Sequence, residues 1–163
     1  MRPGNRCACG KREADFRRRS PRRTPSVANM STHVVRSRHV ARVVRCAPRR
    51  VYEFAADPDN LPKWAAGLAR SEVRRVGDAL VAESPMGEVT VRFVGSNDYG
   101  VLDHEVTLPS GTTVHNPMRV LPHPDGAEVV FTVRQIDPTD DEFDRDTRMV
   151  EEDLARLAAL LES

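Results

Sequence analysis

The C-terminal segment 139–163 constrains the fold most, because its pattern predicts one long amphipathic helix. Thr139 and Glu142 have the spacing of a capping box, which marks where the helix begins. At 1.5 Å per residue such a helix is roughly 35 Å long, and its apolar stripe needs a groove of similar length. The residues of the stripe recur every three or four positions: Phe143, Thr147, Val150, Leu154, Leu157 and Leu161.

The middle of the chain predicts strands separated by short turns. The predicted strands are 70–76, 79–84, 88–94, 99–108, 112–121 and 127–136. Connections this short place consecutive strands antiparallel, so the six strands form a meander. Val89, Val91 and Phe93 alternate with Thr90 and Arg92, as expected for a sheet with one face packed and one face in water. The apolar face of this sheet is the groove that the terminal helix requires.

Two further kinds of element precede the meander. Residues 38–46 have a strand-like pattern and add a seventh strand. Pro48 suits the first turn of a helix, which Pro58 ends. A second short helix or turn then leads to Trp64, the only tryptophan. The sequence therefore predicts an α+β fold with seven strands, two short helices after the first strand and a long C-terminal helix.

The segment APRRVYEFAADPDNLPKWAAGL, residues 47–68, runs from a helix through an Asp-Pro turn to a tryptophan. With the terminal helix, it resembles the helix-grip fold of the START-like (SRPBCC) superfamily over residues 38–162. Segments 100–111 and 114–120 resemble a bacterial polyketide cyclase-like subgroup of that superfamily. The resemblance implies one curved, seven-stranded antiparallel sheet that grips the C-terminal helix.

The same resemblance implies a function based on a cavity. The superfamily includes aromatic polyketide cyclases, lipid-transfer domains and plant allergen-type ligand carriers, with the ligand held between the sheet and the terminal helix. It has no universal catalytic motif, so no catalytic residue is carried over to this chain. Inward-facing strand positions are the candidates for a ligand site.

His104 is the first of these candidates. It shares one face of its predicted strand with Leu102 and Val106, whereas Asp103 and Glu105 lie on the other face. An inward imidazole could hydrogen-bond a ligand carbonyl, or act as a general acid or base in an aldol-type cyclisation. The alternative is a core histidine whose nitrogens are satisfied by a neighbouring strand or a buried water.

Asn116 is a second inward candidate, although a bulge at Pro117 would reverse the facing of the residues beyond it. Apolar candidates would line a cavity for a flat molecule, or would be plain core. Tyr99, with Arg92, would stand at the rim or simply face water. The full set of predicted ligand-binding residues is Trp64, Met86, Tyr99, Leu102, His104, Asn116, Met118 and Phe131.

Three hypotheses about function follow. In the first, the domain binds a small hydrophobic or aromatic ligand, polyketide-like or lipid-like, in a closed cavity. In the second, it is an enzyme of the cyclase or dehydratase kind that uses His104 as acid or base, with Asn116 or Tyr99 positioning oxygen atoms. In the third, it is a regulatory partner that retains the fold without a useful cavity. The sequence does not identify the ligand.

Charge divides the chain near Met30. Residues 1–29 hold nine basic and two acidic residues, a net charge of +7, whereas the remaining 134 residues hold 16 basic and 22 acidic, a net charge of −6. The basic segment lacks apolar periodicity and is predicted to be disordered. It could be a phosphate-seeking arm, a transit peptide, a metal site at Cys7 and Cys9, or an upstream region before a true start at Met30. The mildly acidic domain 30–163 argues against nucleic-acid binding by the folded part.

Other classes of function lack their motifs. The sequence has no Gly-rich phosphate loop, no His-x-x-x-His pair, no nucleophile elbow and no CxxC, so no metal and no cofactor are predicted. Three cysteines form neither an even disulfide framework nor a four-ligand zinc set, which favours the reducing cytoplasm. No segment of the sequence resembles a membrane span. A homodimer through an exposed strand edge remains open.

Overall fold

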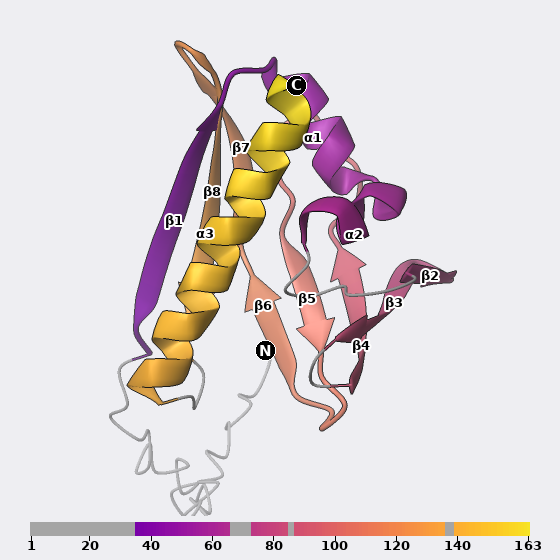
Figure 1. Ribbon diagram of the computed structural model, residues 1–163. Coiled ribbons are helices and arrows are strands. Elements are labelled where there is room, and N and C mark those ends of the chain that lie inside the picture. Colours follow the sequence, from indigo (N-terminus) through magenta and orange to yellow (C-terminus); the bar gives the residue numbers. More distant parts are fainter. Residues whose placement is uncertain (1–34, 66–72, 85–86, 136–138) are drawn as a thin grey trace, which may run out of the picture. The chain divides into compact units, whose positions relative to one another are not determined.

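The computed structural model describes residues 35–65, 73–84, 87–135 and 139–163, which belong to the unit Val34–Ser163 (Figure 1). Two of the predictions lie outside the described residues: the basic segment 1–29 and the candidate site residue Met86. In chain order the N-terminal elements are β1 (Ser37–Val44), α1 (Pro48–Ala56), the 3₁₀ helix η1 (Pro58–Asn60) and α2 (Leu61–Trp64). The remaining elements are β2 (Val73–Val76), β3 (Ala79–Ser84), β4 (Gly87–Phe93), β5 (His104–Thr107), β6 (Thr113–Asn116), β7 (Met118–His123), β8 (Gly126–Arg134) and α3 (Asp140–Glu162).

The strands form two antiparallel sheets, so the prediction of a single seven-stranded sheet is wrong. One sheet has the order β1-β8-β7 and the other the order β2-β3-β4-β5-β6. The predicted strand 112–121 is in fact β6 and β7, which meet at Pro117. Proline has no N–H to donate to a strand ladder, and its fixed φ favours a break. Consequently β6 pairs with β5 while β7 pairs with β8, and the chain crosses from one sheet to the other at this residue.

Backbone hydrogen bonds around Pro117 hold the two sheets together. The N–H of Leu102 donates to the carbonyl of Met118 at 2.9 Å, and the N–H of Val120 donates to the carbonyl of Gly100 at 2.8 Å. Gly100 has a φ of +69°, and a Cβ there would lie 2.1 Å from the carbonyl oxygen of Val120, so only glycine fits. These contacts occupy the first half of the predicted strand 99–108, and regular pairing begins only at His104.

Asp103 adds a side-chain link at the same place. Its Oδ1 accepts a hydrogen bond from the backbone N–H of Met118 at 2.8 Å and forms an ion pair with Arg119. Met118 is fully buried, so its N–H cannot turn to water instead. Asp103 therefore ties the segment that precedes β5 to the first residues of β7.

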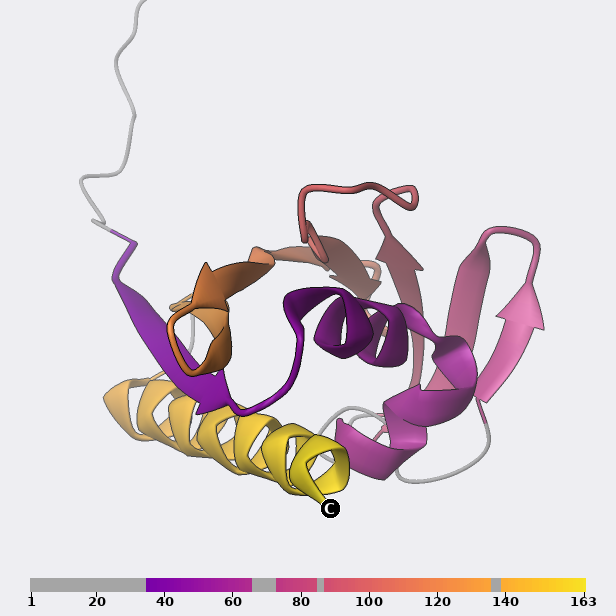
Figure 2. The same ribbon diagram turned by 90° about the horizontal axis from the view of Figure 1, so that it is seen from above.

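The terminal helix α3 packs along β1 and β8 and against α2 (Figures 1 and 2). The predicted capping box is confirmed: the Thr139 side chain accepts from the N–H of Glu142, whose carboxylate accepts from the N–H of Thr139. Phe143 is buried, and the guanidinium of Arg38 in β1 lies 4.5 Å from the centre of its ring. Most of the predicted stripe is buried, namely Phe143, Thr147, Leu154, Leu157 and Leu161, while Val150 is partly buried.

We expect Thr139→Ala to destabilise the domain by about 1 kcal/mol, because the first turn of α3 loses the hydroxyl that accepts from the N–H of Glu142. Chemical denaturation followed by far-ultraviolet circular dichroism measures the loss. Thr139→Ser keeps the accepting oxygen and should retain most of the stability. An equal loss in both variants would show that the methyl group, not the cap, matters.

We expect Asp103→Ala to lower the free energy of unfolding by roughly 1–3 kcal/mol, because the buried N–H of Met118 loses its acceptor. Asp103→Asn keeps an oxygen for this N–H and loses only the ion pair with Arg119. Both side chains of that pair are about one third exposed, so this loss should be ~0–1 kcal/mol. Urea unfolding of both variants tests the difference, and similar losses would contradict the role given to the hydrogen bond.

Candidate functional site

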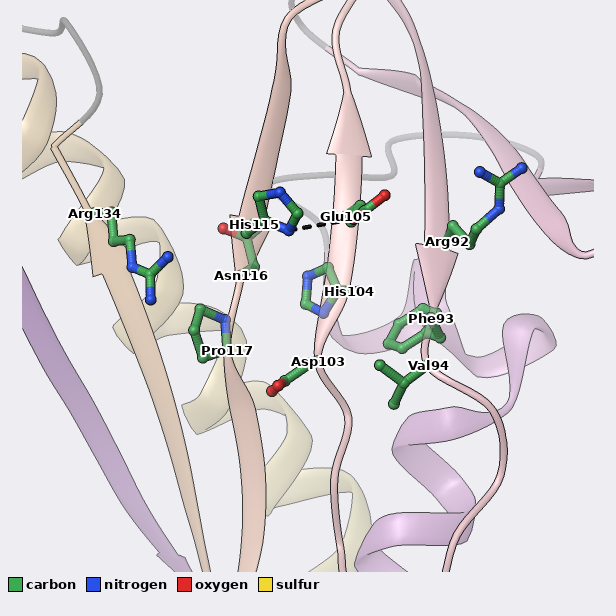
Figure 3. A pocket seen from close by; sticks show the side chains of 10 residues that line it. All are labelled: Arg92, Phe93, Val94, Asp103, His104, Glu105, His115, Asn116, Pro117 and Arg134. Carbon is green, nitrogen blue, oxygen red and sulfur yellow. Dashed lines mark ion pairs between the residues drawn. The ribbon is translucent and has the colours of Figure 1, made fainter. Parts of the chain in front are cut away.

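A pocket of about 500 Å³ lies where the two sheets separate (Figure 3). It is lined by β4, β5, β6, the residues next to them and the end of β8. The lining residues are Arg92, Phe93, Val94, Asp103, His104, Glu105, His115, Asn116, Pro117 and Arg134. Consecutive residues of a strand point to opposite faces, yet 103–105 all contribute. Backbone as well as side-chain atoms of these residues can therefore line the pocket, which extends from β4 to the last residue of β8.

This pocket is not in the place that the family resemblance implies. The resemblance puts the ligand between the sheet and the terminal helix, whereas none of the described lining residues belongs to α3. Packing explains the difference, because Leu154 and Leu157 of α3 and Met118 of β7 are fully buried in one hydrophobic core. These side chains thus belong to the core in the region where the resemblance implies a ligand cavity.

His104 is the most buried polar residue of the pocket. Only 7% of its surface is exposed, and its ring lies 4.8 Å from the ring of Phe93 and 5.7 Å from that of Phe131, measured between centres. Its Nδ1 lies 3.0 Å from the carbonyl oxygen of Leu102. A carbonyl can only accept, so Nδ1 carries the proton and Nε2 keeps its lone pair in the neutral ring.

Burial lowers the pKa of His104 below the ordinary value of 6.5, although the hydrogen bond to Leu102 opposes part of this shift. The imidazole is therefore neutral at pH 7. Among the residues that the structure describes, Nε2 has no hydrogen-bond partner. Asn116 is the register partner of His104 on β6, and Figure 3 shows the imidazole between β5 and this residue. The pocket thus combines a free nitrogen acceptor with a nearby amide.

Charged groups surround this neutral centre. Glu105 and His115 face each other across β5 and β6, with Oε1 and Nδ1 3.3 Å apart. Arg92 forms an ion pair with Asp78 at 3.2 Å. The sequence pattern predicted that Glu105 lies on the face away from the ligand, and it gave no indication of Arg134. No local pattern could have found Arg134, because its position beside β6 depends on the separation of two sheets.

The other predicted site residues are scattered. Phe131 lies beside His104, but Leu102, Met118 and Trp64 are buried in the core. The Nε1 of Trp64 is buried without a hydrogen-bond partner. Tyr99 is 83% exposed and does not line the pocket. The structure thus brings His104 and Asn116 together in one pocket, with Phe131 adjacent, and the ligand-binding role of all these residues remains a prediction.

Two further kinds of feature are absent from the described part of the chain. It contains no group of three or more His, Cys, Asp or Glu side chains arranged to hold a metal ion. None of its helices is both long enough and apolar enough to cross a membrane.

Comparison with known proteins identifies the family. Residues 32–162 match the model of the family described as polyketide cyclase/dehydrase and lipid transport. The chain belongs to this family. The match confirms the resemblance to the SRPBCC superfamily and its polyketide cyclase-like subgroup. No curated protein matches the sequence.

Solved structures share the fold at low sequence identity. Protein CV1439 from Chromobacterium violaceum is 19% identical with a TM-score of 0.58, over 78% of this chain and 98% of that one. DynU16, a protein in the dynemicin biosynthetic locus, is 13% identical with a TM-score of 0.62, over 78% of this chain and 47% of DynU16. The Aha1 dimer from Colwellia psychrerythraea is 16% identical with a TM-score of 0.60, over 79% of this chain and 96% of that one.

The stability of the domain should fall as the pH drops below 6.5, the ordinary histidine value, in a way that depends on His104. The unfolded chain binds a proton there, whereas the folded chain resists protonation of the buried ring. We expect wild type to lose more stability than His104→Gln between about pH 7.5 and about pH 5.5. Urea unfolding at both pH values measures this, with His39→Gln, which removes an exposed histidine, as the control. Parallel losses in wild type and His104→Gln would contradict the prediction.

Proposed function

We propose that this domain binds a small, flat hydrophobic or aromatic molecule in the pocket around His104, with the imidazole accepting a hydrogen bond from the ligand. The family supports ligand binding or cyclase chemistry as the general class of function. The observation that carries the proposal is the state of His104: its Nδ1 is fixed on Leu102, whereas its Nε2 is unpartnered among the described residues. Among the described residues, Nε2 is not one of the fully buried atoms without a partner. It is therefore accessible, and a ligand hydroxyl or N–H can donate a hydrogen bond to it.

The surroundings of His104 favour an aromatic or similarly flat ligand. The rings of Phe93 and Phe131 lie 4.8 Å and 5.7 Å from the imidazole, measured between centres, and Val94 and Pro117 add apolar surface to the pocket. Aromatic groups bury a large area and prefer tilted or edge contacts with other rings, which is the arrangement around His104. Asn116 can donate to or accept from a polar group of the same molecule.

Catalysis by the same pocket is the second candidate, and the neutral His104 favours it. In an aldol-type cyclisation, Nε2 would take a proton from a carbon between two carbonyls. The resulting enolate would then attack the carbon of another carbonyl group further along the same molecule. The imidazolium would return the proton to the new alkoxide oxygen, so no oxidant or reductant is required. Asn116 would orient a carbonyl oxygen. Loss of water from the product would then complete a dehydratase reaction.

Native mass spectrometry of the full chain, purified without detergent, tests the binding proposal. We expect a reproducible extra mass of a small molecule that disappears under denaturing conditions. His104→Gln should lower the bound fraction, whereas His39→Gln on β1 should not. A ligand-free spectrum, together with no rise in melting temperature across a panel of flat hydrophobic molecules, would contradict binding, because a ligand of the folded state must stabilise it.

The two candidates differ in what His104 does for turnover. A poly-β-keto thioester offered to the full chain should yield a cyclised product only if the domain is an enzyme. Under that hypothesis, His104→Gln abolishes the product, while a reduced fraction of the chain still carries the substrate mass. No product from the wild-type chain, with the substrate still bound, would favour the carrier.

The same spectra report the number of subunits. One structurally similar protein is described as an Aha1 dimer, which is compatible with the homodimer left open by the sequence. A homodimer of this chain would appear at twice the subunit mass. The cytoplasmic location suggested by the cysteines is part of the same proposal.

A further inference from the structure

We infer that the pocket selects ligands that carry a carboxylate, and that Arg134 is the residue that recognises it. This inference rests on the proposed function, since it names the chemical class of ligand for the same pocket. Arg134 is the last residue of β8 and forms the wall of the pocket across β6 from His104. In Figure 3 its side chain lies beside Asn116 and Pro117.

The pairing of charges singles out Arg134. Four other charged groups at or beside the pocket already have partners: Arg92 is paired with Asp78, and Asp103 with Arg119. Within the described part of the chain, no carboxylate forms an ion pair with Arg134. An arginine next to a pocket without an internal counter-ion is suited to bind an anion from outside.

The negative groups of the pocket lie on the other side of β6. Both lining carboxylates, Asp103 and Glu105, are on or next to β5, and each has a partner, Arg119 or His115. A carboxylate at Arg134 would therefore lie closer to the guanidinium than to either of them. Coulomb energy falls with distance, and water screens it further. At the β8 wall, attraction of the ligand carboxylate to Arg134 therefore exceeds its repulsion by Asp103 and Glu105.

The planar guanidinium suits the planar carboxylate of a flat acid. Arginine presents two parallel N–H groups that match the two oxygens of a planar carboxylate. A flat acid could then place its ring near Phe93 and His104 and its carboxylate at Arg134. The ligand class is thus an aromatic or polyketide-like acid rather than a neutral lipid.

Isothermal titration calorimetry of the full chain with two matched probes tests this inference. 1-Naphthoate carries a carboxylate, and 1-naphthamide has the same ring and nearly the same shape without the charge. We expect wild type to prefer naphthoate by about fivefold or more, a modest factor because Arg134 is exposed to water. Arg134→Gln should remove this preference while leaving naphthamide binding unchanged.

The control is Arg92→Gln, because Arg92 lines the same pocket but is paired with Asp78. It should keep the preference for naphthoate within a factor of about two. Arg134→Lys should keep part of it, since the charge remains and the two-pronged geometry is lost. Far-ultraviolet circular dichroism checks that each variant is folded.

Other outcomes separate this inference from the proposed function. Equal binding of both probes to wild type would overturn the carboxylate assignment and leave ligand binding intact. Tighter binding of 1-naphthyl phosphate than of naphthoate would also overturn it. A preference that survives in Arg134→Gln would assign the recognition to another residue and so refute the role of Arg134. Absence of binding by every probe would overturn both proposals.

Discussion

The missing N–H of Pro117 is the constraint on which the arrangement of this domain depends. A continuous strand 112–121 would have joined β5 to β8 and closed the strands into one sheet. Because proline cannot donate to a ladder, β6 stays with β5, and β7 joins β8. The chain then needs other hydrogen bonds across the break, and the carbonyl of Met118 and the carboxylate of Asp103 provide them. The pocket lies at this junction and is lined by residues of β4, β5, β6 and the last residue of β8.

The long helix α3 packs against β1, β8 and α2, and it contributes none of the described residues that line the pocket. Its capping box fixes where α3 begins, and its apolar stripe fills the groove beside β1 and β8. Arg36 and Arg38 of the N-terminal strand region lie over the ring of Phe143 and pair with Asp140 and Asp144 of α3. These exposed ion pairs contribute little individually, and burial of the stripe supplies most of the stabilisation. The pocket around His104 lies away from α3, at the junction of the sheets.

The strand pairing and the backbone around His104 determine the chemical state of its imidazole. Its position opposite Asn116 follows from the pairing of β5 with β6, and its tautomer follows from the carbonyl of Leu102. A buried imidazole that is neutral at pH 7 suits a binder and a general base equally well. The family includes both kinds of protein in its description. The two candidates would differ in whether a bound molecule reacts, and the proposed role of Arg134 concerns which molecules bind.

Sequence by itself determined the terminal helix, most of the other local elements and the family. The helix 139–163 was predictable because its cap and its periodicity are local, and the burial of His104 was predictable because strand alternation with Leu102 and Val106 is local too. The sequence also flagged Pro117 as an edge or a bulge, yet which strand pairs with which depends on contacts between residues far apart in the chain. Only the tertiary structure therefore decided that there are two sheets, that Leu102 and Met118 belong to the core, and that Arg134 lies beside the pocket. A pocket at the junction of two sheets has no sequence signature, because its walls come from elements that only folding brings together.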